Sequence, residues 1–585
     1  MVRLISAAVL ALAVSPGLVS AEPFPEHRRL PQPQPEQQRH AASSSTTKAE
    51  ESFAPSLDRA RENAVHVFNA VHSAMRQWGS SIHHNGLGLI PATIPRGTTL
   101  YHGSRSNSTP AGPEWLAFEV EHSEGFARSF RGGRGSPPPR PPGKGPGKGP
   151  PPGERLPPPV IARDGGQVPM TAADDDRDRA VRGYFHTYRA NRDLRLLYID
   201  GMAAGKTDMG TLDTQDFLLR GLQSAPGFGE YERARDLCEI VTSWGLDGVI
   251  RMEIGFEAIY CDFANGLDFL GALRRPWSDQ IEGERGGSDM FEWTRAVGQR
   301  YDGIGGGRVR LDWGGVVSGF WYPLDLRNPE REDMPRLGTV TTSQRDVILG
   351  RVKEVLEKGP EGKVDWQGVV DMIVTRHADR IEAMADEDGD EEGFVSQALV
   401  VTNTFVDYPR DASDAHVLED ELSKTARERC VTHFLTPAAV WKDAFPPEDE
   451  LVYAAVEQVT ARICGDIFAV RSLLLSAAPK LASPAAFSSA GILDILSERD
   501  DDDKMGDAVK TGRKVYQRLK KDLDWSVWKK CKPGCGVAEV CFVAMWPFGL
   551  REDHYSPRCR NRTAMAGRRA GPGDGEGYWN LNPRN

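Results

Sequence analysis

A change of hydrophobic period near residue 335 is the feature that most limits how this chain can fold. Before it, short β-prone runs such as residues 194–199 and 248–252 alternate with turn residues. After it, apolar residues recur every three or four positions, most clearly over residues 452–474, where one helix face stays apolar for about six turns. We therefore expect an α+β domain with a mixed or antiparallel sheet, followed by an α-helical domain.

Local patterns within the first of these regions predict individual elements. Apolar spacing over residues 64–78 predicts a helix that ends at Gly79, and a turn at Gly255 is expected to join two strands. Gly314-Gly315 predicts a hairpin between residues 308–313 and 316–322.

Composition sets the expected domain boundaries. The α+β domain should span residues 56–335, interrupted over 131–160 by an insert of proline, glycine and basic residues that has no core of its own. The helical domain should span residues 336–525, and a cysteine-rich tail should cover 526–585. Gly201-Met202-Ala203-Ala204-Gly205-Lys206-Thr207 is one residue too short for a phosphate-binding loop.

The first residues have the pattern of a cleavable signal peptide. Arg3 precedes an apolar run over residues 4–14, and Val19-Ser20-Ala21 is a small-residue cleavage site. An N-terminal membrane anchor is the alternative, but the run is short for a bilayer, and we expect no stable membrane span. Residues 1–21 are therefore expected to be removed on secretion, and residues 22–55, rich in Pro, Gln and Ser, to form a disordered leader.

Eight cysteines support an oxidising compartment, either extracellular or the lumen of the secretory pathway. Cys238 with Cys261 and Cys430 with Cys464 are expected bridges, whereas the four terminal cysteines permit three pairings. Zinc is the rival ligand of the terminal group, because Cys-x3-Cys is close to ligand spacing; we expect disulfides and no metal. The terminal cysteines are Cys531, Cys535, Cys541 and Cys559. Asn107 and Asn561 begin two N-glycosylation sequons.

A formal net charge of −11 argues against a nucleic-acid-binding protein, which would carry a basic excess. The sequence does not identify the partner, and a protein or the cell wall is the class of partner we expect for a secreted chain. No cofactor is implied by any complete motif.

Three segments resemble large uncharacterised secreted proteins of filamentous fungi. They are Leu196-Leu197-Tyr198-Ile199-Asp200-Gly201-Met202, Tyr301-Asp302-Gly303-Ile304-Gly305-Gly306, and Val540-Cys541-Phe542-Val543-Ala544-Met545-Trp546-Pro547-Phe548-Gly549. That resemblance covers most of the chain and implies no activity.

Residues 97–263 resemble the ADP-ribosyltransferase fold. The resemblance rests on Leu100-Tyr101-His102-Gly103-Ser104, on Glu114-Trp115-Leu116-Ala117-Phe118 followed by Ser123-Glu124-Gly125-Phe126-Ala127-Arg128-Ser129-Phe130, and on Gly255-Phe256-Glu257-Ala258-Ile259-Tyr260. In that family one strand presents a His or Arg to a dinucleotide, a second leads into a helix with an aromatic, and a later one presents a catalytic Glu. The residue usually Tyr or Ser at the second strand has no clear counterpart in this chain.

The resemblance implies a chemistry for these residues. Cleaving the nicotinamide–ribose bond of NAD builds positive charge on the ribose, as glycoside cleavage does. Glu257 would stabilise that charge, His102 would hold a ribose, and Phe126 or Phe130 would stack on the nicotinamide. NAD would then be the substrate.

Two classes of function follow from the sequence. The chain is either a secreted glycoprotein without catalytic activity, which serves in binding or at the cell wall, or an ADP-ribosyltransferase-like enzyme. The two are distinguished by whether His102 and Glu257 face one cleft, with an aromatic side chain between them and room for a dinucleotide.

Overall fold

The computed structural model describes residues 53–129, 181–207, 209–222, 229–277, 290–298, 307–329, 331, 333–338, 340–408, 419–498, 504–566 and 577–579. The expected signal peptide, nearly all of the expected leader, the basic insert and Phe130 lie outside these residues. Residues from Phe53 onward form one compact unit, so the expected boundaries at residues 335 and 525 stay predictions.

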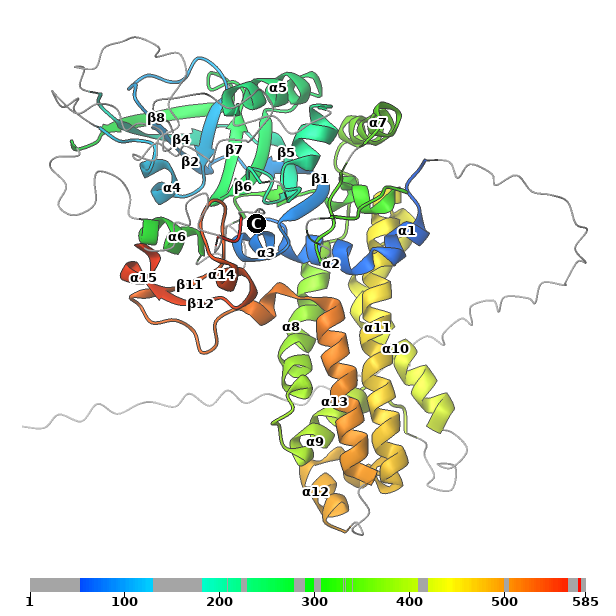
Figure 1. Ribbon diagram of the computed structural model, residues 1–585. Coiled ribbons are helices and arrows are strands. Elements are labelled where there is room, and N and C mark those ends of the chain that lie inside the picture. The colour runs from blue at the N-terminus through cyan, green and yellow to red at the C-terminus, as the bar shows by residue number, and fades with distance from the viewer. Residues whose placement is uncertain are drawn as a thin grey trace, which may run out of the picture. The chain divides into compact units, whose positions relative to one another are not determined.

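A ten-stranded mixed sheet is the centre of the first half of this unit (Figure 1). The strand order is β10-β1-β5-β6-β7-β3-β2-β4-β8, with β9 paired to β1, and β5 and β6 are the only parallel neighbours among the described strands. Its strands are β1 (Asn85–Ile94), β2 (Thr99–Ser104), β3 (Glu114–Ala117), β4 (Tyr184–Ala190), β5 (Leu194–Gly201), β6 (Gly248–Glu253), β7 (Gly255–Tyr260), β8 (Leu267–Arg274), β9 (Arg310–Leu311) and β10 (Val317–Ser318).

Helices supply the rest of the unit, and the long ones follow residue 335. They are α1 (Leu57–Glu62), α2 (Ala64–Ser73), α3 (Gln77–Ile82), α4 (Val120–Glu124), α5 (Glu230–Ser243), α6 (Met290–Gly298), α7 (Thr342–Lys358), α8 (Trp366–Ala385), α9 (Glu391–Asn403), α10 (Glu419–Ala439), α11 (Pro447–Ala477), α12 (Ser489–Ser497), α13 (Lys504–Leu523), α14 (Arg551–Tyr555) and α15 (Arg562–Ala566). The expected fold class, a mixed α+β region before a helical region, is confirmed.

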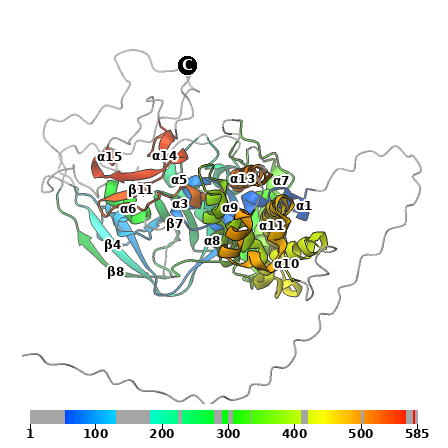
Figure 2. The same cartoon turned by 90° about the horizontal axis from the view of Figure 1, so that it is seen from below.

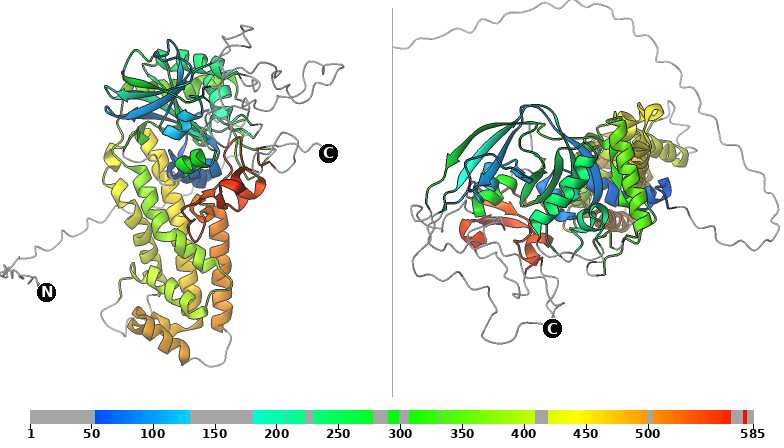
Figure 3. Two further views of the ribbon diagram at one scale, coloured as in Figure 1. Left: turned by 90° about the vertical axis from the view of Figure 1, so that its left-hand side faces the viewer. Right: turned by 90° about the horizontal axis from the view of Figure 1, so that it is seen from above.

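The helical region packs around α11, the longest helix. Figure 3 shows α8, α11 and α13 side by side, and the view from below in Figure 2 shows their ends close together with α10 against α11. Buried Val452, Val459 and Ile467 continue the apolar stripe that predicted this helix. Removing such a stripe from water is the main favourable contribution to folding of the bundle.

The first helices connect the sheet to the bundle. Asn69 of α2 donates from Nδ2 to the carbonyl oxygen of Leu523 at 3.0 Å, and both outer guanidinium nitrogens of Arg76 donate to the carboxylate of Asp371 at 2.7 and 2.5 Å. The predicted end of a helix at Gly79 is wrong, because Gly79 lies inside α3. A Cβ there would come within 2.6 Å of Ser73 Oγ, so the glycine allows α3 to pack closely on α2.

Of the two glycine turns predicted from the sequence, the one at Gly255 is confirmed and the one at Gly314-Gly315 is wrong. The turn at Gly255 joins β6 to β7 as an antiparallel pair, with Arg251 opposite Glu257, and its φ of 92° is one that glycine tolerates. The predicted hairpin at Gly314-Gly315 is wrong, because β9 and β10 both pair with β1 and not with each other.

The C-terminal tail forms a two-stranded sheet of β11 (Glu539–Phe542) and β12 (Arg558–Asn561), which lies beside α6 in Figure 2. The structure joins Cys238 to Cys261 and Cys430 to Cys464, the two expected couples. In the tail it joins Cys531 to Cys541 and Cys535 to Cys559, one of the three open pairings. Among the helices that the structure describes, none is long and apolar enough to cross a membrane.

Candidate functional site

The sheet opens between β2 and β3, and a pocket occupies the opening. The two strands share a single register pair, Tyr101 with Ala117, so they separate on either side of it. Twelve residues line the pocket: His102, Gly103, Ser104, Arg105, Glu114, Trp115, Ala117, His122, Ser123, Phe126, Tyr231 and Glu257. The sequence-predicted residues His102, Phe126 and Glu257 all border this pocket, from β2, the turn after α4 and β7. The register sets Glu257 on the same face of the sheet as Ala117 and Tyr101, so His102, the next residue of β2, starts from the opposite face, where its ring packs against His186 and Phe263.

The pocket is narrow. Its empty space is about 620 Å³ when counted out to open solvent, but the centre of a water molecule fits in only about 70 Å³ of it. A buried water needs roughly 10–15 Å³ by that measure, so the interior takes several waters or one small group. The room for a whole dinucleotide that we expected beside His102 and Glu257 is not present inside it.

His102 is buried, with 6% of its surface exposed, and its imidazole is neutral. Burial lowers the pKa of His102 to about 4, although the bond to the Trp115 carbonyl opposes this. Nδ1 lies 2.8 Å from that carbonyl oxygen, which only a protonated Nδ1 can satisfy. Nε2 is consequently the acceptor of the ring, a state suited to receiving a hydrogen bond from a hydroxyl.

Glu257 is 2% exposed and lies on β7, opposite Ala117 of β3 and Arg251 of β6. Its Oε1 accepts a hydrogen bond from Arg251 Nε at 2.9 Å, and its Oε2 lies 3.9 Å from His122 Nε2. Burial raises the pKa of Glu257 to about 7 despite the opposing charge of Arg251. The carboxyl group is thus poised to change its charge near neutral pH.

Arg251 is fully buried and divides its charge between two carboxylates. Besides Glu257, it donates to Glu230 Oε2 at 2.5 Å and to Gln215 Oε1 at 3.0 Å. Burial alone would raise the pKa of Glu230, but the charges of Arg251, Lys206 and Arg233 together lower it to about 2. Glu230 is therefore the carboxylate that neutralises Arg251, which leaves Glu257 as the one whose charge is poorly compensated.

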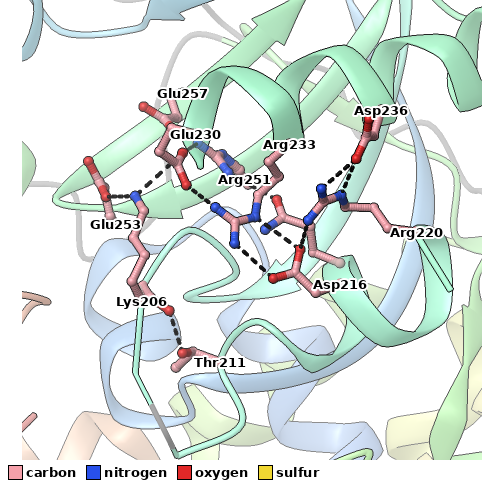
Figure 4. Close-up of polar contacts among 12 residues, drawn as sticks. Lys206, Thr211, Asp216, Arg220, Glu230, Arg233, Asp236, Arg251, Glu253 and Glu257 are labelled. Atoms are coloured by element: carbon pink, nitrogen blue, oxygen red, sulfur yellow. Dashed lines mark hydrogen bonds and ion pairs between the residues drawn. The ribbon is translucent and has the colours of Figure 1, made fainter. Parts of the chain in front are cut away.

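The ion pairs continue away from the pocket as one connected network, drawn in Figure 4. Arg233 joins Glu230 to Asp216, with 2.8 Å between its Nη2 and Asp216 Oδ2, and Arg220 joins Asp216 to Asp236. Such a network fixes the strand ends and the start of α5 relative to one another.

Lys206 has its partners inside the same network. Its Nζ lies 2.9 Å from Glu253 Oε2 and 3.5 Å from Glu230 Oε2, and the Trp546 ring lies 4.8 Å away. The lysine of the shortened phosphate-loop pattern therefore makes structural ion pairs.

An aromatic wall closes the pocket behind Glu257. The His122 ring stacks on Trp293 at 5.2 Å, and Phe126 meets Trp293 edge-on at 6.3 Å. Burial lowers the pKa of His122 to about 4, so this imidazole is neutral. Within the part of the chain that the structure describes, His122 Nδ1 and Trp115 Nε1 are buried without a hydrogen-bond partner, which is costly unless a ligand or water supplies one.

Glu114 and Tyr231 form the opposite wall. Tyr231 Oη donates to Glu114 Oε1 at 3.2 Å, and burial raises the pKa of Glu114 to about 7. The Tyr231 ring also meets Trp115 edge-on at 5.0 Å. Sequence reasoning assigned no role to Glu114, His122 or Tyr231, because their proximity depends on the pairing of β3 with β7 and on the docking of α5. It also assigned none to Arg251, which the β6–β7 hairpin places opposite Glu257.

The remaining sequence-predicted positions lie elsewhere. Asn107 is exposed between β2 and β3, and Asn561 is exposed at the end of β12, where its Oδ1 accepts from the Ala564 backbone N–H at 2.9 Å. In the described part of the chain, the sulfurs of Cys531, Cys535 and Cys559 form the only group with metal-ligand proximity, and all three are bonded in disulfides.

Comparisons with known proteins identify fungal relatives. Residues 47–283 match the family model of the YPL277C N-terminal domain. The chain is 27% identical over 557 residues to the uncharacterized protein YOR389W of Saccharomyces cerevisiae. The aligned region covers 84% of this chain and 83% of that protein. It is 29% identical over 405 residues to the uncharacterized protein YPL277C of the same yeast, which covers 59% of this chain and 80% of that one.

These matches support a relationship to uncharacterised fungal proteins, in agreement with the expected fungal resemblance. No solved structure matches the chain. The resemblance to ADP-ribosyltransferases receives no support from the matches, so it depends on the geometry of the pocket alone.

Proposed function

We propose that the pocket between β2, β3 and β7 binds the nicotinamide end of NAD and cleaves its nicotinamide–ribose bond, as in an ADP-ribosyltransferase-like enzyme. One observation carries this proposal. The residues that the resemblance names, His102, Phe126 and Glu257, lie far apart in the chain and line a single pocket.

The size of the pocket decides which part of NAD enters it. Space for one small group suits the nicotinamide ring, with the ribose at the mouth and the adenosine half outside. Phe126 and His122 line this space, and we expect the Phe126 ring to stack on the nicotinamide.

The reaction breaks the bond between C1′ of the ribose and the ring nitrogen, and the bonding electrons leave with the nicotinamide, which becomes neutral. The ribose gains positive charge, which the Glu257 carboxylate stabilises from within a buried site where charges interact strongly. A nucleophile then bonds to C1′ and loses its proton. His102 Nε2 accepts a hydrogen bond from a ribose hydroxyl and holds the sugar in place.

The decisive experiment measures nicotinamide release from NAD by the purified, disulfide-bonded chain at pH 8. Glu257→Gln keeps the shape and removes the charge, and we expect it to lower the rate by about 100-fold or more. Glu448→Gln is the matched control, since Glu448 is 3% exposed and also paired with an arginine, Arg351, but lies on α11. Equal rates for wild type and Glu257→Gln would remove Glu257 from the reaction.

A binding protein without catalytic activity is the second candidate. The contacts that Glu257 already makes with protein groups favour it. Both of its carboxylate oxygens already face protein groups, Arg251 and His122, as in a structural ion pair. If neither wild type nor Glu257→Gln releases nicotinamide, the pocket serves binding or structure only.

We also propose that the chain is a secreted glycoprotein. All eight cysteines are paired, and both sequon asparagines are exposed. Expression in a fungal host should yield medium-borne protein that begins after Ala21 and shifts in mass on treatment with an N-glycosidase. Retention of all protein inside the cells with an intact N-terminus would contradict this.

A further inference from the structure

The two disulfides of the C-terminal tail lie against each other. Cys531 is bonded to Cys541 and Cys535 to Cys559, yet the sulfurs of Cys531, Cys535 and Cys559 all lie within 4.8 Å of one another. These three cysteines are half-buried, whereas Cys541 is 9% exposed. A thiolate released at Cys535 or Cys559 therefore lies beside a sulfur of the other bond, at a place that solvent reaches.

A second pairing, Cys531 with Cys535 and Cys541 with Cys559, fits the same backbone. Cys541 of β11 is directly opposite Cys559 of β12, so their side chains leave the same face of this sheet. Opposite residues of an antiparallel pair have Cα atoms about 4.5–5.5 Å apart, within the range of about 4.4–6.8 Å that a disulfide spans. Cys531 and Cys535 are separated by the exposed residues 532–534, which can adjust without moving the core.

The surroundings of the cysteines favour thiolates. Arg295 of α6 and Lys530 line the surface groove beside the two bonds, and nearby positive charges favour the thiolate over the thiol. The Cys531 backbone N–H donates to Cys541 Sγ at 3.0 Å, and the same donor would stabilise a thiolate that leaves from Cys541. Glu539 also lines the groove, where its Oε2 accepts from the Gly536 backbone N–H at 3.3 Å.

We propose that these four cysteines form a thiol–disulfide exchange site, which takes a low-molecular-weight thiol as co-reactant and alternates between the two pairings. The thiolate of the small molecule attacks Cys559 Sγ, and the bonding electrons leave on Cys535 as a thiolate. Cys535 attacks Cys531 Sγ and releases the Cys541 thiolate, which attacks Cys559 across the strand pair and expels the small thiolate. The protein holds two tail disulfides before and after, so no oxidant or reductant is consumed.

The exchange changes what the tail strands are bonded to. In the present pairing, β11 and β12 are both cross-linked to the loop 531–535. Lys532 of this loop donates to Asp379 Oδ1 at 3.2 Å and to Glu382 Oε2 at 2.5 Å, both on α8. In the alternative pairing the strands are cross-linked only to each other and the loop only to itself. The cross-links between the tail sheet and the loop that contacts α8 are thereby opened.

Peptide mapping distinguishes the two pairings by mass. Trypsin, which leaves the Lys532–Pro533 bond intact, together with a glutamate-specific protease cuts the tail into peptides that include 531–539, 540–551 and 559–560. The present pairing holds these three peptides in one species. The alternative pairing yields peptide 531–539 with an internal disulfide, and a separate species in which 540–551 is joined to 559–560.

The test incubates the purified, disulfide-bonded chain with a mixture of reduced and oxidised glutathione at pH 8, then acidifies and alkylates it before digestion. We expect at least about one chain with the alternative pairing for every ten with the present one, a ratio that corresponds to about 1.4 kcal/mol. The Cys430–Cys464 bond, whose cysteines are fully buried, is the internal control and should keep its pairing. A tail that keeps its three peptides in one species, or that is reduced without forming the internal bond of 531–539, would overturn the proposal.

Cys559→Ser tests the step inside the cluster without any added thiol. The variant leaves Cys535 as a thiol beside the Cys531–Cys541 bond. We expect the same fraction of chains to carry the free thiol on Cys541 instead, detected as alkylated peptide 540–551. Alkylation confined to Cys535 would count against the exchange. Neither measurement involves NAD, so their outcome is independent of the reaction proposed for the pocket.

Discussion

Removing the Arg251 guanidinium is the change that most severely tests how the pocket is held. Arg251 is fully buried and donates to Glu257, Glu230 and Gln215. In Arg251→Met the side-chain volume is largely kept, but the central cation of the network is lost. Glu230 keeps Arg233 and Lys206 as partners, whereas Glu257 loses the cation that faces it.

The magnitude follows from the burial of these charges. Breaking a buried ion pair by removing one partner costs about 3–5 kcal/mol, because the other charge is left uncompensated. We expect that loss in the free energy of unfolding at pH 8, where Glu257 is ionised. At pH 5.5 the loss should be smaller, because burial already raises the pKa of Glu257 to about 7 and its protonated form needs no cation.

Equilibrium urea denaturation at both pH values, followed by tryptophan fluorescence, measures this loss. Arg189→Met is the matched control, because Arg189 pairs with Asp268 at 2.6 Å with half of its side chain exposed, and such pairs contribute only about 0–1 kcal/mol. Adding Glu257→Gln to Arg251→Met should recover at least about 1 kcal/mol at pH 8 by removing the unpaired charge. A loss below about 1 kcal/mol for Arg251→Met, no larger than the control's, would refute the reasoning.

Three further outcomes are expected. Gly103→Ala should lower stability by about 1–3 kcal/mol, because its Cβ would lie 2.3 Å from the Ser123 carbonyl oxygen, whereas Gly112→Ala, with nothing within 4 Å, should be neutral; equal melting temperatures would contradict this. Replacing both Cys430 and Cys464 by serine opens a loop of 34 residues and should cost about 3–4 kcal/mol in urea denaturation, and a variant as stable as wild type would show that the bridge contributes nothing. The folded state raises the pKa of Glu257 from 4.5 to about 7, so the stability that protonation supplies below pH 4.5 is lost as the pH rises to 7; wild type should lose stability relative to Glu257→Gln over that range, and parallel pH–stability curves would be inconsistent with the raised pKa.

Local patterns were sufficient for much of the fold. Short β-prone runs on both sides of Gly255 predicted the β6–β7 hairpin, and helical spacing predicted the apolar stripe of α11. The same hairpin places Arg251 opposite Glu257, so this ion pair could have been read from the sequence once the turn was fixed at Gly255.

Other elements depend on contacts distant in sequence. Strand β1 was missed because Gly86, Gly88 and Pro91 are residues that normally weaken a strand. The structure explains one of them: a Cβ on Gly86 would lie 2.1 Å from the backbone of Asp200, so only glycine allows β1 to approach β5 this closely. A pattern within one segment does not contain that information.

Some residues of the pocket could be named from the sequence, and others could not. A family resemblance named His102, Phe126 and Glu257, which the structure brings together. Glu114 and Tyr231 could not be joined from sequence, because one begins β3 and the other belongs to α5, and only the packing of the helix on the sheet brings them into contact. The narrow interior of the pocket was equally outside the reach of sequence, since it depends on how His122, Phe126 and Trp293 pack.

A crystal structure of Glu257→Gln grown with NAD is the most direct test of the proposed NAD site, because the variant should bind the substrate without cleaving it. We expect the nicotinamide ring to lie against Phe126 and His122, with C1′ of the ribose facing residue 257. NAD bound elsewhere on the chain, or a pocket that stays empty at saturating NAD, would contradict the claim.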